Sequence, residues 1–265
     1  MSTPADSDSP SVGTALATLT IAGSIATLTL NRPEQRNALS VELLAALHAR
    51  TDELAAACRS APITCCIITG AGKAFCAGMD LKLVLGNPAA ALQLLTELGL
   101  LTLKIRALPC ITLAVANGAA IGGGCGLVTV CDLALTHHQS KMGFPEVDLG
   151  VCPAVVAPWL CKKIGFGKAR QVLLSGGLLS GSEAAKLGIV TESYETPELL
   201  QIGAQATATR LAGAAPHALA ATKHLLNELD GSLDEPLIRR AAKLSADVLC
   251  TPESQAMLRA KLGAP

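Results

Sequence analysis

Two glycine-containing segments, each placed after an apolar run, hold the residues best suited to chemistry in this sequence. The first reads Gly-Ala-Gly-Lys-Ala-Phe-Cys-Ala-Gly-Met-Asp over residues 70–80, and the second reads Asn-Gly-Ala-Ala-Ile-Gly-Gly-Gly-Cys-Gly over residues 117–126. Glycine has no Cβ atom, so such a backbone can approach a ligand closely, and a helix that begins there aims unpaired N–H groups outward. One N–H group from each segment, directed at the same point, would polarise a carbonyl group.

The elements that must position these segments alternate between strands and helices. β-Branched and apolar residues on both sides of the Ala-Gly-Ser turn at 22–24 predict a hairpin, and the apolar runs 63–69 and 111–116 predict buried strands. Helices are predicted over 40–58, with a serine as the capping residue, and over 88–107. This order indicates an α/β architecture with crossover connections.

The second half of the chain adds short elements and then a helical region. A helix is expected to begin at Pro153, and a brief helix over 182–188 is expected to lead into a strand over 189–192. From residue 197 to 265 the pattern is helical almost throughout. The apolar content of this region predicts that it packs against the core or against another subunit.

These patterns predict one main domain with an appendage. The first 14 residues, 1–14, are rich in Ser, Pro and Asp and are expected to form a disordered tail. The core is expected over 15–196 and a C-terminal helical oligomerisation region over 197–265. No linker long enough to separate two independent domains is visible.

The charge and the aromatic content argue against a nucleic-acid partner. The formal net charge is zero, from 21 Lys and Arg against 21 Asp and Glu, which removes the positive field that binding to a phosphate backbone requires. Aromatic residues make up only 2% of the chain, so a surface on which bases stack is not expected.

The cysteines and the apolar runs indicate the compartment. Ten cysteines are scattered singly or as the pair Cys65-Cys66, without a Cys-x-x-Cys motif, which favours buried reduced thiols over disulfides or a zinc site. Charges or prolines interrupt the apolar runs before the roughly 18 residues that a membrane span needs, and no signal or transit pattern is seen. The sequence predicts a soluble, cytoplasmic protein with no membrane partner.

Four motifs follow one another with a characteristic order and spacing. They are Leu-Asn-Arg-Pro-Glu-Gln-Arg-Asn-Ala-Leu over 30–39, Phe-Cys-Ala-Gly-Met-Asp-Leu-Lys over 75–82, the segment 117–132 that ends in Cys-Asp, and Phe-Pro-Glu with Leu-Gly over 144–150. Together they resemble the crotonase, or enoyl-CoA hydratase/isomerase, superfamily over roughly residues 16–190. A dinucleotide fingerprint and a Walker-type phosphate loop are both missing.

The resemblance implies a fold and a reaction type. The fold is an α/β crotonase-type spiral of ββα turns with a C-terminal helical trimerisation region, and hence a homotrimer or homohexamer. The substrates are acyl-CoA thioesters, with coenzyme A as part of the substrate and no separate cofactor or metal. By position, the backbone N–H groups of Met79 and Gly123 form the oxyanion hole that stabilises a thioester enolate, each donor contributing about 3 kcal/mol. The alternative is that the glycines only allow close helix–strand packing.

Glu146 occupies the position where the resemblance implies a catalytic carboxylate. A carboxylate beside an apolar acyl pocket has a raised pKa and can move protons at the carbons next to the thioester. The alternative is a solvated loop glutamate or an ion-pair partner. Asp80 is expected to fix its loop by accepting backbone N–H groups, and Asp132 and Asp148 are expected to be structural.

Contacts to coenzyme A are also implied by the resemblance. The backbone around Ala77 is similar to the segment that contacts adenine, and Lys82 and Lys223 are candidates for phosphate contact, against the alternative that they are merely solvated. His137 and His138 are adjacent and point in different directions, which argues against a shared metal, and a helical face is their expected setting.

The main departure from the family lies at Gly126, where hydratases usually carry a second glutamate. Hydration asks for one group to activate water and, in the usual scheme, a second to place it and return a proton, whereas one carboxylate can shuttle a proton between two carbons. The segment 153–158 also lacks the glycines usual in hydratases. We therefore expect a single catalytic glutamate, and we expect Gly126→Glu to raise hydration.

Three functions follow from these residues. The first is an enoyl-CoA hydratase of fatty acid metabolism that hydrates a 2-enoyl-CoA with Glu146 as the sole acid and base. The second is an enoyl-CoA double-bond isomerase, which Gly126 favours. The third is a noncatalytic acyl-CoA-binding protein, against which the presence of Glu146 beside two oxyanion donors argues.

Overall fold

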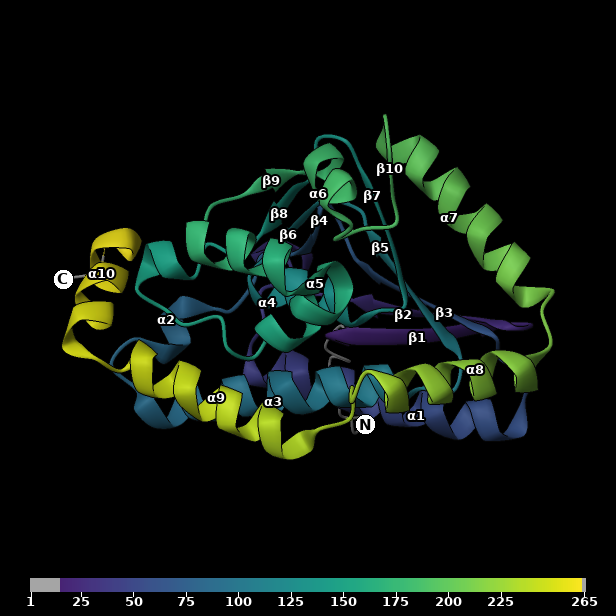
Figure 1. Cartoon of the computed structure of the whole chain (residues 1–265), viewed down its shortest axis with the longest axis horizontal. Coiled ribbons are helices and arrows are strands. Elements are labelled where there is room, and N and C mark those ends of the chain that lie inside the picture. The colour runs from purple at the N-terminus through teal and green to yellow at the C-terminus, as the bar shows by residue number, and fades with distance from the viewer. Residues whose placement is uncertain (1–14, 264–265) are drawn as a thin grey trace, which may run out of the picture.

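The computed structural model describes residues 15–263, which form two sheets surrounded by helices (Figure 1). The strands are β1 (Ala17–Ala22), β2 (Ile25–Leu30), β3 (Cys65–Gly70), β4 (Ala74–Cys76), β5 (Ile111–Ala116), β6 (Ala119–Ile121), β7 (Leu133–His137), β8 (Lys141–Gly143), β9 (Leu179–Ser180) and β10 (Glu192–Tyr194). The α-helices are α1 (Val41–Ser60), α2 (Leu81–Val84), α3 (Pro88–Ala107), α4 (Gly123–Val130), α5 (Ala157–Ser175), α6 (Gly181–Leu187), α7 (Pro197–Ala212), α8 (Pro216–Leu229), α9 (Glu235–Leu249) and α10 (Pro252–Leu262). The tail expected over 1–14 lies outside the described residues.

The larger sheet has the strand order β1-β2-β3-β5-β7-β10 and confirms the α/β architecture. Its first pair is the predicted antiparallel hairpin, which turns at Gly23 with a φ of +60°. The following pairs are all parallel, and parallel neighbours need long crossover connections, which α1 and α3 provide. The strands predicted over 63–69 and 111–116 are β3 and β5.

The smaller sheet has the order β4-β6-β8-β9 and determines where the functional segments meet. β4, β6 and β8 run parallel to one another, and β9 joins β8 antiparallel. Because parallel strands end at the same edge of a sheet, the segments that follow β4, β6 and β8 emerge side by side. These segments belong to three of the four family motifs and carry Met79, Gly123 and Glu146.

α3 is the central helix of the core. It packs against α1, α4 and α9, and Leu94, Leu98 and Leu101 are buried in these contacts. By length and composition alone α3 is also long and apolar enough to cross a membrane, although charges and prolines were predicted to interrupt every such run. Nine of its twenty residues are buried in the fold, as in the core helix of a globular protein, while Leu92 stays exposed.

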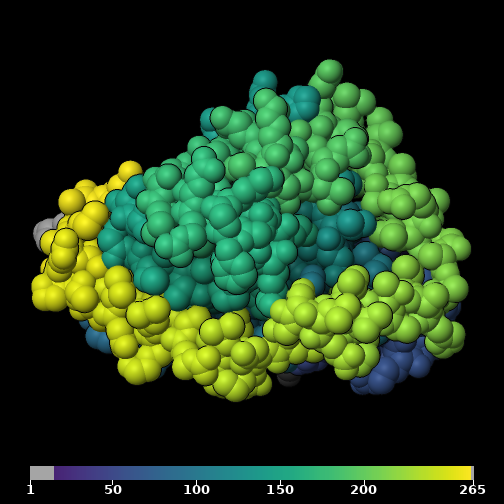
Figure 2. All heavy atoms as spheres, in the orientation of Figure 1, coloured from purple at the N-terminus to yellow at the C-terminus, as the bar shows by residue number. Residues whose placement is uncertain are grey.

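The C-terminal helices pack on the core instead of standing apart from it. α7 covers one face of the larger sheet, with Leu200, Ala204 and Ala208 against β3, β5 and β7, while α9 lies alongside α3 (Figure 1). Figure 2 shows α8, α9 and α10 as a continuous band along one edge of the molecule. Large apolar side chains stay exposed on α5, α7 and α8, among them Phe166, Leu174, Ile202 and Leu229.

Two element boundaries differ from the predictions. The helix predicted to begin at Pro153 begins at Ala157, and the residues between them form an irregular segment that lines the cavity described below. The strand predicted over 189–192 is β10, which begins at residue 192. At residue 189 the chain still belongs to the end of α6, where the Ile189 N–H donates to the Ala184 carbonyl, and contact with β7 begins only at Thr191, whose N–H donates to the Ala134 carbonyl.

A wholly buried asparagine fastens the loop that leads into β4. Asn37 donates from Nδ2 to the carbonyl oxygens of Ala71 and Ala74, at 3.0 and 2.9 Å, and its Oδ1 accepts the Arg32 N–H at 2.8 Å. Asn117 binds the same loop from the other side through both its amide nitrogen and its amide oxygen. Side-chain amides thus replace sheet pairing where the chain turns between β3 and β4.

We predict that Asn37→Asp lowers the free energy of unfolding by about 3 kcal/mol, measured by urea denaturation at neutral pH. The carboxylate donates no hydrogen bond and faces two carbonyl oxygens in a buried site. Asn87→Asp is the matched control, because Asn87 caps α3 only by accepting the Ala90 N–H, a role that Asp fills equally well. Equal losses in the two variants would contradict the argument.

Candidate active site

Three parallel strand ends bring the predicted donors and carboxylate to one cavity. Met79 follows β4, Gly123 opens α4 directly after β6, and Glu146 follows β8. All three line a cavity with about 630 Å³ of space between atoms, its open mouth included, and Ala77 lines it as well. The carboxyl ends of parallel strands are where ligands of such sheets bind.

Glycines allow the first two segments to lie directly on each other. Gly78 has a φ of +92°, and a Cβ atom on it would lie 2.7 Å from the carbonyl oxygen of Ile121. A Cβ atom on Gly124 would lie 2.4 Å from the carbonyl oxygen of Cys76. Both distances are too short for any side chain, so the close helix–strand packing considered in the sequence analysis is present and accompanies the cavity.

The two proposed donors have no acceptor in the part of the chain that the structure describes. Among residues 15–263, neither the Met79 N–H nor the Gly123 N–H donates to a protein acceptor, whereas the adjacent Gly122 N–H is taken by the Gly143 carbonyl at 2.8 Å. Gly123 is the first residue of α4, where the helix dipole is positive. The cavity therefore has two N–H groups that a ligand oxygen can use.

Glu146 presents a buried carboxyl to the same cavity. A Cβ atom on Gly122 would lie 3.0 Å from its Oε1, which places the carboxyl against the start of α4. Its Oε2 is buried and has no hydrogen-bond partner in the described structure. Burial raises the pKa of Glu146 to about 7, with only its own backbone N–H acting in the other direction. A carboxyl that titrates near neutrality can both take and return a proton.

The backbone around Glu146 is fixed by local hydrogen bonds. Its carbonyl oxygen accepts the Leu149 N–H at 3.0 Å and the Val151 N–H at 2.8 Å, which closes the short 3-10 helix η2 (Val147–Leu149). The preceding Phe144 is wholly buried. The carboxyl is therefore held at the cavity by its chain on both sides, and not by a side-chain partner.

Apart from Glu146, the cavity wall is uncharged. Its side chains are mainly Met, Leu, Ile, Val and Pro, and the other polar side chains in it are those of Ser245 and Cys152. The Ser245 hydroxyl is already committed, because it donates to the Cys152 carbonyl at 2.7 Å and accepts the Ala154 N–H at 3.1 Å. Water or substrate groups that enter the cavity thus meet one functional carboxyl.

Gly126 lies behind the wall and not in it. A Cβ atom on Gly126 would lie 2.4 Å from Cγ1 of Val156, and Val156 is the residue that lines the cavity. A glutamate at position 126 can reach the cavity only if Val156 shifts, so the expected gain in hydration from Gly126→Glu stays a prediction that depends on this shift. The sequence could not reveal this pair, since its members lie on separate elements.

The residues considered for coenzyme A are not all near the cavity. Ala77 lines it, whereas the exposed Lys82 on α2 does not. Lys223 is only 4% exposed, and its ammonium lies 2.8 Å from Asp132 and donates to the Cys110 carbonyl at 2.9 Å. The structure therefore corrects the phosphate-contact prediction for Lys223, because its ammonium group is buried and pairs with Asp132.

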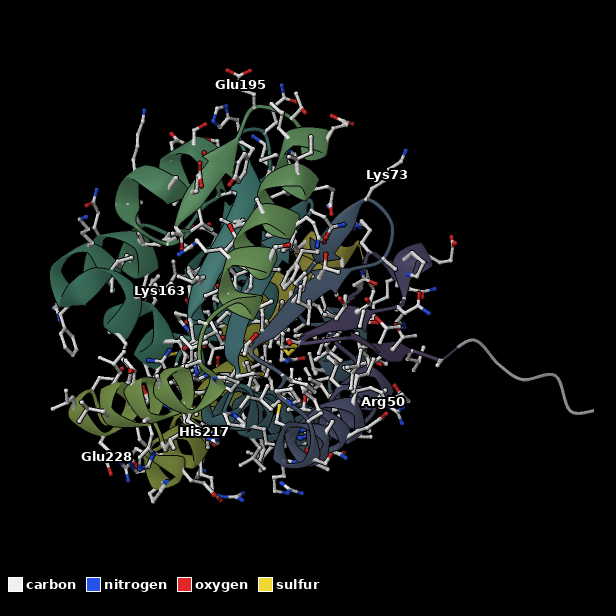
Figure 3. All side chains as sticks on the ribbon, turned by 90° about the vertical axis from the view of Figure 1, so that its right-hand side faces the viewer. Arg50, Lys73, Lys163, Glu195, His217 and Glu228 are labelled. Atoms are coloured by element: carbon white, nitrogen blue, oxygen red, sulfur yellow. The ribbon has the colours of Figure 1, made fainter. Side chains whose placement is uncertain are left out.

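Asp132 is structural, as expected, and is the centre of a charged cluster that sequence reasoning missed. Its Oδ2 accepts the N–H and the hydroxyl of Thr112 at 2.8 and 2.9 Å, and its carboxylate also meets Arg106 and Lys223. Lys163, labelled in Figure 3 on α5, donates to the Asp132 carbonyl at 3.0 Å. The cluster fixes the start of β7 and none of these residues lines the cavity.

Asp80, Asp148 and His137 do not line the cavity, and each contributes to the fold instead. Asp80 pairs with the Arg32 guanidinium at 3.4 Å and caps no backbone N–H of α2, so its expected loop-fixing role was wrong in detail. Asp148 accepts the Gly177 N–H at 2.7 Å, as a structural residue. His137 ends strand β7 and is not on the helical face expected for it. Within residues 15–263, His, Cys, Asp and Glu form no cluster of three or more that would hold a metal ion.

We predict that Glu146→Gln stabilises the protein at pH 8 but not at pH 4. The folded-state pKa lies above the unfolded value, so ionisation of Glu146 costs stability as pH rises from about 4.5 to about 7. The glutamine keeps the shape of the protonated carboxyl, which gives an expected gain of roughly 3 kcal/mol at pH 8. Urea unfolding of both proteins at the two pH values checks this, and an equal difference at both would contradict the buried, unpaired carboxyl.

Comparisons with known proteins identify the family of the chain. The family model described as enoyl-CoA hydratase/isomerase matches residues 20–256. The chain is similar to the 2,3-dehydroadipyl-CoA hydratase of Escherichia coli, with 33% identity over 76% of this chain and 77% of the relative. Among solved structures it is similar to an enoyl-CoA hydratase from Mycobacterium avium (27% identity, TM-score 0.83, 95% and 98% of the two chains covered). An enoyl-CoA hydratase/isomerase from Marinobacter aquaeolei is also similar (31% identity, TM-score 0.75, 94% and 97% covered). The chain therefore belongs to the enoyl-CoA hydratase/isomerase family.

Proposed function

We propose that this protein is an acyl-CoA enzyme that hydrates a 2-enoyl-CoA, with Glu146 as the single catalytic acid and base. The observation that carries the proposal is the buried, unpartnered Oε2 of Glu146 in an otherwise uncharged cavity that also holds two N–H groups without an acceptor. Such a set serves a reaction in which one proton moves and one oxygen gains charge.

The two donors act on the thioester oxygen. The N–H groups of Met79 and Gly123 bind the carbonyl oxygen of the thioester and draw electron density from the conjugated double bond. Because the donors are held by backbone packing, they need not reorganise as negative charge develops. Loss of one such donor raises the barrier by about 3 kcal/mol.

Glu146 moves the proton. As a carboxylate it takes a proton from a water molecule while the water oxygen bonds to C3 and the electrons of the double bond pass to the thioester oxygen. The enolate then collapses, and the protonated Glu146 returns that proton to C2. A pKa of about 7 suits both halves of the cycle, since the carboxyl must give up the proton as easily as it takes it.

A named relative supports hydration over other reactions. The E. coli protein that shares 33% identity with this chain is a 2,3-dehydroadipyl-CoA hydratase, and its match covers 77% of its length. We extend the hydratase activity to this chain, but not the dicarboxylic substrate, for the reason given in the next subsection.

Double-bond isomerisation is the second candidate, and the apolar side chain of Val156 over Gly126 favours it. Here Glu146 takes a proton from C2 of a 3-enoyl-CoA and returns it to C4, and no second group is required to place water. A noncatalytic acyl-CoA-binding role is disfavoured, because a buried carboxyl without a partner is costly to keep when no chemistry uses it.

For the rest of the bound molecule, we propose that the backbone at Ala77 contacts the adenine and that the exposed Lys82 contacts phosphate. We also propose that the chain assembles as a homotrimer or homohexamer. The exposed apolar side chains of Phe166, Leu174 and Leu229 support assembly, since contact with another subunit would remove their surface from water.

We predict that Glu146→Gln lowers kcat/KM about 10³-fold for the productive substrate. Absorbance of the conjugated thioester is followed with trans-2-enoyl-CoA and with 3-enoyl-CoA: loss of signal from the first indicates hydration, and gain from the second indicates isomerisation. Glu195→Gln is the control, because Glu195 lies exposed on the loop before α7 (Figure 3). No change with either substrate in the wild-type protein would overturn the catalytic proposal.

A further inference from the structure

We propose that the acyl group accepted by this site is short and uncharged, and that Val156, seated on Gly126, is the residue that limits its length. The inference deepens the proposed function and rests on one part of it, namely that the acyl group of a CoA thioester occupies the cavity beside Glu146. It does not depend on which reaction follows.

The chemistry of the wall excludes charged acyl groups. Among residues 15–263, the lining of the cavity holds no Lys, Arg, His or Asp and a single carboxylate, that of Glu146, while the hydroxyl of Ser245 already makes two hydrogen bonds to backbone. A terminal carboxylate on the acyl chain would be buried without a cation, and it would share the cavity with a second carboxylate. Burying an unpaired charge is costly, so an uncharged hydrocarbon chain is the fitting occupant.

Val156 closes the wall toward α4. Its side chain is only 3% exposed and lies directly on the bare backbone of Gly126, where a Cβ atom would be 2.4 Å from its Cγ1 and 3.2 Å from its Cβ. The volume that a side chain at position 126 would occupy is thus filled by the valine. Behind the valine lies α4 itself, whose residues from Gly123 to Val130 are all buried, so the acyl chain finds no further room in this direction.

The neighbouring Val155 closes the wall toward α3 and α9. A Cβ atom on Gly99 of α3 would lie 2.6 Å from Ile238 of α9 and 3.6 Å from Val155, so the two helices and this segment meet without intervening space. Ser245 of α9 also holds the segment through the Ala154 N–H. A wall tied to two helices does not move aside at low cost, since interiors of this density resist deformation.

The Gly126–Val156 contact offers two substitutions with opposite effects. Val156→Ala removes two methyl groups above a helix that has no side chain there, which deepens the cavity. Gly126→Ala adds a methyl group beneath Val156 and pushes the valine into the cavity. Gly126 has an ordinary helical backbone conformation, so alanine introduces no backbone strain.

Binding of saturated acyl-CoA thioesters tests the inference without requiring turnover. The dissociation constants of butanoyl-, hexanoyl-, octanoyl-, decanoyl- and adipoyl-CoA are measured by calorimetry for the wild-type protein, Val156→Ala and Gly126→Ala. Val128→Ala is the matched control, because Val128 is buried in the same helix α4 but does not line the cavity.

We expect the wild-type protein to bind decanoyl-CoA about tenfold more weakly than butanoyl-CoA, because of its length. We also expect it to bind adipoyl-CoA about tenfold more weakly than hexanoyl-CoA, which has the same number of carbons but no terminal carboxylate. Val156→Ala should reduce the decanoyl penalty by about tenfold, Gly126→Ala should weaken hexanoyl-CoA relative to butanoyl-CoA, and Val128→Ala should leave the wild-type pattern unchanged. Gly126→Ala keeps the test decisive if Val156→Ala does not fold.

Contrary outcomes are specific. Equal binding of butanoyl- and decanoyl-CoA by the wild-type protein, or the same length profile in Val156→Ala and Val128→Ala, would overturn the role of Val156. Adipoyl-CoA bound as tightly as hexanoyl-CoA would overturn the uncharged class. If the binding pattern holds and no enoyl-CoA is turned over, the proposed reaction fails while this inference stands, and if no thioester binds, both fail.

Discussion

Direct contact between two backbones is the constraint on which the rest of this structure depends. The segment after β4 and the segment after β6 touch where Gly78 meets the Ile121 carbonyl and Gly124 meets the Cys76 carbonyl. A single Cβ atom at either glycine would separate them. Since the Met79 and Gly123 N–H groups belong to these segments, their spacing is set by the backbone itself. Side-chain variation around the cavity leaves it unchanged.

The same arrangement explains why the carboxyl of Glu146 can stay unsatisfied. Its backbone is held by β8 pairing and by η2, so the carboxyl needs no hydrogen bond to keep its place. Desolvation then raises its pKa to about 7. The free energy that this burial costs is balanced by a large apolar core, in which α3 contacts α1, α4 and α9. The free energy gained by packing this core therefore allows the protein to keep a buried, unpaired carboxyl at the cavity.

Sequence patterns predicted the elements that depend on local periodicity and missed those that depend on contacts. The hairpin at Gly23, the Ser40 cap of α1 and the bounds of α3 and β5 follow from local signals. The Lys223–Asp132 pair joins α8 to the start of β7, and no spacing in a single sequence indicates such a pairing. The contact between Gly126 and Val156 is of the same kind, which is why the missing second carboxylate was visible but the side chain filling its place was not.

The tie between Ser245 and the segment at Ala154 has a consequence for how the chain matures during synthesis. The ribosome releases the protein from its N-terminal end, so the strands that carry Met79, Gly123 and Glu146 emerge well before α9 does. Until α9 arrives, Gly99 and the neighbouring face of α3 are uncovered, and the wall made by Val155 has nothing behind it. The reactive groups are therefore synthesised before the pocket is complete, and selectivity for the acyl group is acquired only when α9 has been made.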